Sequence, residues 1–343
     1  MWLTTRGRVK ELNLKQQLLK HLEDSGDNYL SGNALAKKLS VSRNAVWKTV
    51  QSLRAEGYEV LATTNKGYRL KSCGDVLSEE GIRKYIRNAG IFNVGVRKSV
   101  TSTNTVLRES AANGAPEGTV LAAEEQTAGK GRQGRQFHSP ARHGVYFSLL
   151  LRPVTNANNA ALITSAAAVA AARAIEDVTG VRAGIKWVND LFANGKKVCG
   201  ILTEATFGME SGQVESAVLG IGINVTKPAE GFPGTLESTA GTLTDRATGK
   251  DNERCRLIAS TLDNFWEFYT DLPARKFLDE YRSRSIILGR DIYVLTGDEK
   301  KPARALAIDE TCGLIVRFEN GETAVLSSGE VSIRPQTSIH NAQ

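Results

Sequence analysis

The segment Gly129–Arg135 places three glycines and three cationic side chains in seven consecutive residues. Glycine lets a backbone pass close to a ligand, and its N–H groups can face an anion. Because no acid lies among the cations, the segment favours an anionic partner. This partner is a phosphate, or a reaction in which negative charge develops at phosphorus. The alternative is a basic loop that simply faces water.

The same segment also fits the Gly-x-Gly-x-x-Gly fingerprint of dinucleotide-binding (Rossmann) domains. That fingerprint requires a preceding strand and a helix that opens at the glycines. Here residues 137–144 are predicted to form a loop, and the apolar run Val145–Leu151 a strand. No Gly-Lys pair is followed by Ser or Thr, as a P-loop requires. The context argues against NAD-dependent oxidoreductase chemistry and against a P-loop site.

A second cluster, Lys186–Asp190, is predicted to lie between the end of one strand and the start of the next. Lys186 has apolar neighbours on both sides, so we expect it to be partly desolvated. A desolvated lysine is a strong electrostatic clamp for a phosphate or a carboxylate. The alternative is an ordinary ion pair between Lys186 and either Asp190 or Glu204.

Neutral hydrogen-bonding side chains accompany these cations. Ser102, Thr103, Asn104 and Gln126 suit a small polar ligand such as a urea or an amide, although each could also be a helix cap. The four histidines are scattered and form no Ser-His-Asp set, and the four cysteines form no Cys-x-x-Cys, so no metal site built from protein ligands is predicted. Such an inventory is typical of phosphoryl or nucleotidyl transfer by positioning and charge stabilisation. We therefore predict that Lys186 and Arg132 are the catalytic residues.

The positive charge is concentrated at one end of the chain. Residues 1–71 carry 13 Lys or Arg and 6 Asp or Glu, whereas the other 272 residues carry 31 of each. The net charge of +7 therefore belongs to this first segment and predicts a polyanionic partner. A soluble basic domain without such a partner is the alternative. The weakly polar run Ala160–Ala172 is too short to span a bilayer, and no signal-peptide core is visible, so a cytoplasmic protein with reduced thiols is expected.

The basic segment has the pattern of a winged helix-turn-helix. Helices are predicted over residues 9–23, 31–39 and 43–56, with Ser42 as the cap of the third, and a β-hairpin over residues 59–63 and 67–71. Arg, Asn and Gln read base edges, while Lys and Arg contact phosphates. A protein-binding module of the same shape is the alternative. The residues predicted to contact DNA are Ser42, Arg43, Asn44, Lys48, Gln51, Lys66 and Arg69.

The rest of the chain predicts an α+β protein. Strands are expected over residues 94–98, 119–123, 145–151, 184–186, 197–204 and 214–224, with helices ending near 112 and 178, which indicates one mixed sheet with helices on it. Five short strands after residue 289 indicate a small barrel. The predicted domains are residues 1–73, 74–285 and 286–343.

Five motifs in order carry a resemblance to a known family. They are Ser102–Asn104, Gln126–Arg135, Lys186–Asp190, Lys197–Leu202 and Gly220–Asn224, and the similarity continues to Gly329–Arg334. Over nearly its whole length the chain resembles the bifunctional biotin protein ligases that also repress the biotin operon. The resemblance implies a catalytic domain like that of class II synthetases, followed by an SH3-like barrel. It also implies a cytoplasmic enzyme that uses ATP, biotin and Mg²⁺ to modify a lysine of the biotin carboxyl carrier protein.

The resemblance further implies which residues hold biotin or its adenylate. These are Ser102, Thr103, Asn104, Gln126, Gly129, Lys130, Gly131, Arg132, Arg135, Lys186, Asn189, Gly200 and Asn224. It implies that the adenylate orders the glycine–cation loop and favours a homodimer that binds palindromic operator DNA. Three positions depart from the family pattern: Lys130 replaces Arg, Val188 replaces Pro, and Phe137 replaces Trp.

Two related functions stay open beside this one. A transcription factor that only senses a metabolite would keep the pocket, but it would not need both Lys186 and Arg132. A ligase or transferase for lipoate or octanoate could share the fold, although the glycine–cation loop and the winged helix favour biotin.

Overall fold

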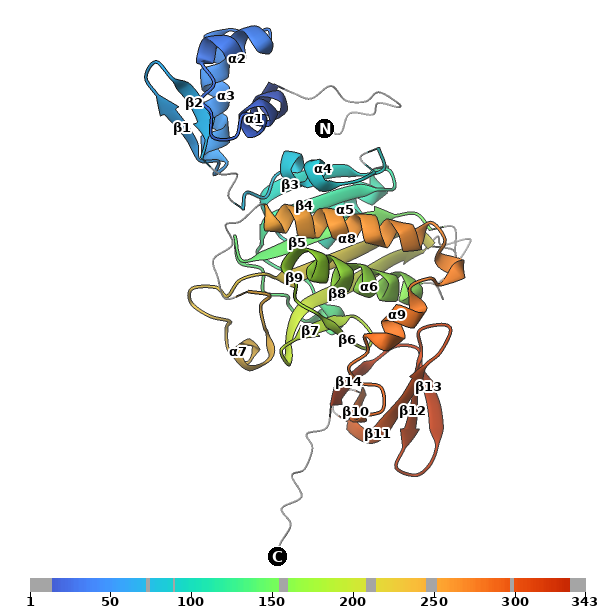
Figure 1. The fold of residues 1–343 in the computed structure, drawn as a ribbon. Helices are drawn as coiled ribbons and strands as arrows, with labels where there is room; N and C mark the ends of the chain where they lie inside the picture. Colours follow the sequence, from blue (N-terminus) through green and yellow to red (C-terminus); the bar gives the residue numbers. More distant parts are fainter. Residues whose placement is uncertain are drawn as a thin grey trace, which may run out of the picture.

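The computed structural model describes residues 14–71, 75–88, 90–153, 160–207, 214–244, 252–296 and 299–333, and Figure 1 shows their arrangement. A small helical head is followed by a large sheet with helices on both faces, and then by a small all-β part. This order confirms the predicted fold class.

The head is the predicted winged helix-turn-helix. It contains α1 (Leu14–Asp24), α2 (Gly32–Lys38), α3 (Arg43–Ala55) and the hairpin β1 (Val60–Thr63) and β2 (Gly67–Leu70). The apolar stripe of α3 is fully buried, as its 3.6-residue period predicts: Val46, Val50 and Leu53. Ser42 caps α3, because its side chain accepts a hydrogen bond from the backbone N–H of Ala45 at 3.1 Å. The predicted start of the first helix at residues 9–13 lies outside the described residues.

The central sheet has seven strands in the order β3-β4-β5-β9-β8-β7-β6. Only β3 and β4 run parallel, and the other neighbours are antiparallel. The strands are β3 (Asn93–Val100), β4 (Thr119–Gln126), β5 (Gly144–Leu151), β6 (Gly184–Lys186), β7 (Asp190–Ala193), β8 (Lys196–Phe207) and β9 (Val214–Asn224).

The two faces of this sheet are covered differently (Figure 1). On one face lie α6 (Ala160–Thr179) and α8 (Glu253–Tyr269), packed along each other. Seven consecutive residues of α6, 166–172, are alanine or valine with no exposed surface, and their small side chains let α8 approach closely. On the other face α5 (Thr103–Ala112) packs Leu107 and Ala111 against the sheet, where it covers only part of the surface. The uncovered part of this face holds the site described below.

Three short helices complete the central part: α4 (Glu79–Tyr85), α7 (Leu236–Thr239) and α9 (Leu278–Ser283). Helix α4 meets the head, where the Tyr58 hydroxyl lies 2.7 Å from Ser78 Oγ and Lys84 pairs with Glu23 at 2.9 Å. No helix of the described residues has the length and apolarity needed to cross a membrane.

The final part is a five-stranded antiparallel sheet in the order β13-β12-β11-β10-β14. Its strands are β10 (Asp291–Thr296), β11 (Glu299–Ile308), β12 (Leu314–Phe318), β13 (Thr323–Leu326) and β14 (Glu330–Ile333), which confirms all five predicted strands. Its core is continuous with that of the central part, and the Trp187 indole donates a hydrogen bond to the carbonyl of Cys312 at 2.9 Å. This contact fixes the last sheet beside the Lys186–Asp190 turn.

Candidate active site

Glycines leave the middle of the sheet bare on the face beside α5. Residues 200, 220 and 222 are all glycine, and Gly200 pairs with Gly222 across β8 and β9. Alternate residues point to one face of a strand, so their neighbours Ile201, Ile221 and Ile223 enter the core on the other face. A methyl group at position 222 would lie 2.5 Å from the Phe137 ring, and one at 200 would lie 3.2 Å from it. The glycines thus admit Phe137, which lies against the sheet as part of the cavity wall.

A chain of hydrogen bonds fixes the neutral polar side chains that line the cavity. The Gln126 side chain accepts hydrogen bonds from the backbone N–H of Thr103 at 2.8 Å and from its hydroxyl at 3.1 Å. At its other end, Gln126 Nε2 donates to Ser139 Oγ at 2.9 Å. Ser148, fully buried in β5, lies 2.7 Å from the Thr103 hydroxyl. The sequence predicted that these polar side chains share one site. The structure adds the hydrogen bonds that orient them.

Asn104 is held by protein partners on both sides of its amide. Its Nδ2 donates to Glu204 Oε2 at 2.8 Å, and its Oδ1 lies 2.6 Å from Ser148 Oγ. A side chain at Gly220 would collide with Asn104 Oδ1, so glycine is required there. Asn104 therefore shapes the wall of the cavity through fixed contacts with β5 and β8.

The glycine–cation segment forms a compact loop between β4 and β5. A single 3₁₀ turn spans Arg132–Gly134, with Gln133 at φ 55° and Gly134 at φ 74°, both in the left-handed region. Gly129 does not line the cavity, and a side chain there would collide with the Phe137 carbonyl. The segment runs from β4 through this turn to the strand β5, which excludes the Rossmann strand–helix arrangement.

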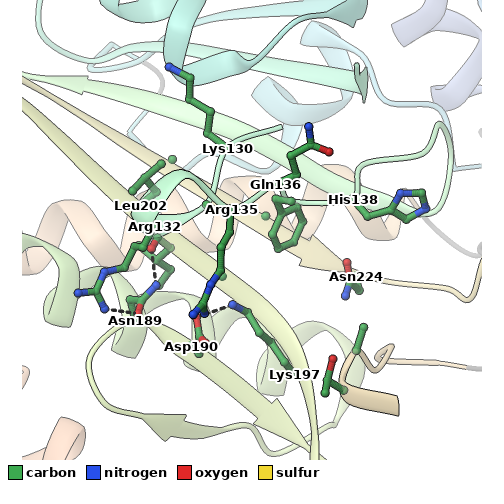
Figure 2. A pocket seen from close by; sticks show the side chains of 18 of the residues that line it. Lys130, Arg132, Arg135, Gln136, His138, Asn189, Asp190, Lys197, Leu202 and Asn224 are labelled. Carbon is green, nitrogen blue, oxygen red and sulfur yellow. Dashed lines mark hydrogen bonds and ion pairs between the residues drawn. The ribbon is translucent and has the colours of Figure 1, made fainter. Parts of the chain in front are cut away.

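Five Lys and Arg side chains line the cavity, and their partners differ. Lys130 lies 3.9 Å from a Glu204 oxygen, Arg135 makes two contacts with Glu330 of β14 at 2.8 and 2.5 Å, and Lys197 pairs with Asp190 at 2.6 Å. Figure 2 shows the side chains of Arg135 and Lys197 converging near Asp190.

The remaining two cations have no carboxylate partner within 4 Å among the described residues. Arg132 donates to the neutral side chain of Asn189 at 3.0 Å, and Lys186 makes no ion pair with these residues. The predicted alternative of a Lys186–Asp190 or Lys186–Glu204 pair is therefore wrong. Burial lowers the pKa of the Lys186 ammonium below its ordinary value, although the charge of Asp190 opposes this shift. Lys186 Nζ also lies 5.5 Å from the centroid of the Phe192 ring.

The cavity enclosed by these elements measures about 490 Å³. All but one of the predicted ligand-binding residues line it; Gly129 is the exception. Asn189 and Asn224 line it while serving as anchors, because Asn189 Nδ2 donates to the Ile201 carbonyl at 2.8 Å and Asn224 Nδ2 to the Gly241 carbonyl at 3.1 Å. A cavity of this size suits a small organic ligand, and its polar groups come from several segments that are far apart in the sequence.

Comparisons with known proteins agree with this geometry. Residues 96–224 match the Biotin/lipoate A/B protein ligase family, residues 15–69 match an HTH domain, and residues 287–334 match the Biotin protein ligase C terminal domain. The bifunctional ligase/repressor BirA of Bacillus subtilis is 35% identical over 92% of this chain and 97% of its own. The chain belongs to the BirA family of bifunctional ligase/repressors. The BirA of Escherichia coli is 26% identical over 89% of this chain and 92% of its own.

Solved structures of ligases from this wider family share the fold. The biotin protein ligase of Aquifex aeolicus in complex with biotin and ATP has a TM-score of 0.58 and 28% sequence identity. It covers 71% of this chain and 98% of its own length. The three family matches of this BirA-family chain follow the order found in the structure: the helix-turn-helix head, the central sheet and the C-terminal sheet.

The three departures from the family pattern take defined positions. The Lys130 side chain extends away from Arg132, Asn189 and Asp190 (Figure 2). Val188 is buried, and its carbonyl accepts a hydrogen bond from Tyr281 at 2.9 Å.

Phe137, the third departure, packs edge-to-face on Tyr146 with ring centroids 6.3 Å apart. Its ring also lies over the bare glycines of β8 and β9.

On the winged helix, Arg43, Asn44 and Lys48 are exposed on α3, as the predicted DNA contact requires. Lys66 is exposed at the turn of the hairpin, between Asn65 and Gly67. Arg69 is different, because it pairs with Asp27 at 2.7 Å and lies 5.3 Å from the centroid of the Tyr29 ring. It therefore braces the wing against the turn after α1.

Some functional partners were not identified in the sequence. Ser148 interrupts the apolar run Phe147–Leu151 of the buried strand β5, and that interruption was a signal available in the sequence. The Arg135–Glu330 pair joins residues 195 positions apart, so no local pattern could reveal it. Arg334, the last residue of the final motif, lies outside the described residues.

Proposed function

We propose that this chain activates biotin with ATP and transfers it to a lysine of a biotin carboxyl carrier protein. The observation that carries the proposal is the pair of uncompensated cations, Arg132 and Lys186, in the wall of one cavity that oriented neutral groups also line. Neutral donors and acceptors suit the ureido group of biotin, and free cations suit a carboxylate and a phosphate.

In the first step a carboxylate oxygen of biotin attacks the α-phosphorus of ATP. A new P–O bond forms, the bond from this phosphorus to the bridging oxygen breaks, and pyrophosphate leaves. Negative charge increases on the oxygens around phosphorus, where Arg132 and Lys186 would stabilise it. Asn189 holds the Arg132 guanidinium in place without neutralising it.

In the second step the amine of the carrier lysine attacks the carbonyl carbon of biotinyl-5′-AMP. A C–N bond forms, the C–O bond to the phosphate breaks, AMP leaves, and the amine nitrogen loses a proton. Mg²⁺ would enter with the phosphates of ATP and offset their charge. Asp190 and Glu330, the carboxylates that line the cavity, are each paired with a cation, and the described residues contain no cluster of three or more potential metal ligands, so the phosphates would supply the ligands of Mg²⁺.

The ligand-binding set predicted from the family resemblance is proposed for this chain, with Gly129 in a supporting role because it does not line the cavity. The adenylate would also act as corepressor: it would order the loop, favour a homodimer and place two winged helices on operator DNA in the cytoplasm. The proposed domain boundaries remain 1–73, 74–285 and 286–343; the first boundary lies outside the described residues.

Transfer of biotin to a purified carboxyl carrier domain tests the ligase. The reaction contains the full chain, biotin and Mg²⁺-ATP, and is read by avidin blot beside a control without ATP. ATP-dependent labelling supports the ligase. Bound biotin without labelling would instead support a sensor without ligase activity, and lack of biotin binding would point to lipoate or octanoate.

A further inference from the structure

Trp47 stands in the middle of the exposed face of α3. Half of its surface is exposed, which is unusual for so large an apolar side chain. Arg43 precedes it by one helical turn and Gln51 follows it by one turn, so the three lie along one line of the helix surface. Helix α3 contains no acidic residue, which suits contact with a polyanion.

The fold of the head does not explain this tryptophan. The stripe of α3 that faces the core is formed by Val46, Val50 and Leu53. Trp47 is not among the partly buried apolar side chains that pack on this core, such as Val41. Within the described residues its ring has no aromatic partner, and its indole N–H has no hydrogen-bond partner.

The exposed ring needs an apolar partner that a phosphate backbone does not provide. The indole has a single N–H donor, but most of its surface is apolar. On the edges of the base pairs in the major groove, the apolar group is the C5 methyl of thymine. Arg43 and Gln51 flank Trp47 with side chains that hydrogen-bond guanine and adenine in the same groove.

We propose that Trp47 is a specificity-determining residue that contacts a thymine methyl in each half of the operator. This inference rests on the proposed DNA-binding function and assigns the apolar part of its base readout. It predicts that affinity depends on a single methyl group at one position of the half-site.

The test uses duplex DNA selected from a random-sequence library by the full chain with biotinyl-5′-AMP. Each thymine of the selected site is replaced in turn by deoxyuridine, which removes only the methyl group, and Kd is measured at fixed salt. At one position per half-site the Kd should rise about fourfold, the factor expected for one buried methyl. Trp47→Ala should weaken binding to the selected site and show no preference for thymine over uracil at that position.

Two further variants separate this role from others. Trp47→Phe keeps an apolar ring and should retain part of the thymine preference, while circular dichroism checks the fold of both variants. Lys48→Ala removes a phosphate contact, so binding should weaken on every sequence and the salt dependence should fall by about one unit of slope. The Lys48→Ala variant should keep the fourfold preference for thymine over uracil.

Several outcomes would overturn the inference. An unchanged thymine preference in Trp47→Ala, or no position sensitive to deoxyuridine, would remove Trp47 from base readout. Loss of adenylate-dependent dimerisation in DNA-free Trp47→Ala would place the residue in a protein contact instead. If the adenylate-loaded chain selects no DNA at all, the repressor function itself fails, and that result differs from all of the others.

Discussion

Removing the charge of Lys186 should disable the first chemical step without unfolding the protein. Among the described residues this ammonium has no ion-pair partner, because Asp190 is paired with Lys197 at 2.6 Å. Its full charge is therefore available to the ligand. A preorganised donor or charge of this kind stabilises a transition state by about 3 kcal/mol, which corresponds to roughly a hundredfold in rate. We expect Lys186→Ala to lower the rate of biotinyl-5′-AMP synthesis at least that far.

The assay is single-turnover formation of biotinyl-5′-AMP from radiolabelled ATP, so that carrier binding does not enter. Lys186→Met keeps an apolar stem of similar length over Phe192 and should lose as much rate as Lys186→Ala. Lys196→Ala is the matched control, since Lys196 is exposed and lies outside the cavity lining. A near-normal rate in Lys186→Ala, with unchanged thermal unfolding, would refute the assignment of Lys186 to the transition state.

Three further predictions follow from the same cavity. Because burial lowers the pKa of Lys186, kcat/KM for adenylation should fall with rising pH before an ordinary lysine, of pKa 10.5, loses its proton. Gly222→Ala would put a methyl group 2.5 Å from the Phe137 ring; the ring must then move, and KM for biotin should rise about tenfold, as steady-state kinetics would show. Glu330→Gln removes the ionic partner of Arg135, a partly exposed pair worth about 0.5 kcal/mol, so trypsin should cut the glycine–cation loop about twice as fast.

The sequence was sufficient to predict those elements whose signal lies in consecutive residues. Ser42, a capping residue before a run of residues with helical period, marked the start of α3 to the residue. The glycines and cations of residues 129–135 identified the loop, and their context excluded a Rossmann helix. The five strands after Gly289 were visible because polar turns separate short apolar runs.

Helix α8 was not predicted, and its buried polar residues explain why. Arg254 is only 2% exposed, with partners in Asp75 at 2.5 Å and Glu124 at 2.7 Å, which lie more than a hundred residues away. Asp263 is likewise buried and accepts a hydrogen bond from the backbone N–H of Arg87 at 2.9 Å. A charged residue on the inner side of a helix obscures the apolar stripe, and only tertiary partners make its burial tolerable.

The division of the cavity cations also required the structure. All five look alike in the sequence, and carboxylates brought close by the fold decide which of them are neutralised: Asp190 beside Lys197, and the more distant Glu204 and Glu330. Glu204 of β8 lies near Lys130, and Glu330 of the last strand pairs with Arg135, so the Arg135–Glu330 pair forms only when the C-terminal sheet and the loop meet. The predicted catalytic pair, Arg132 and Lys186, is the pair that these carboxylates leave free.

The most direct test of the central claim is the formation of biotinyl-5′-AMP by the purified chain alone. The full chain would be incubated with biotin, Mg²⁺ and ATP labelled at the α-phosphate, and the products separated by chromatography. The proposed mechanism predicts a labelled adenylate that requires biotin and appears together with one equivalent of pyrophosphate. Binding of biotin and ATP without any adenylate would contradict it, since the cavity would then hold both substrates without joining them.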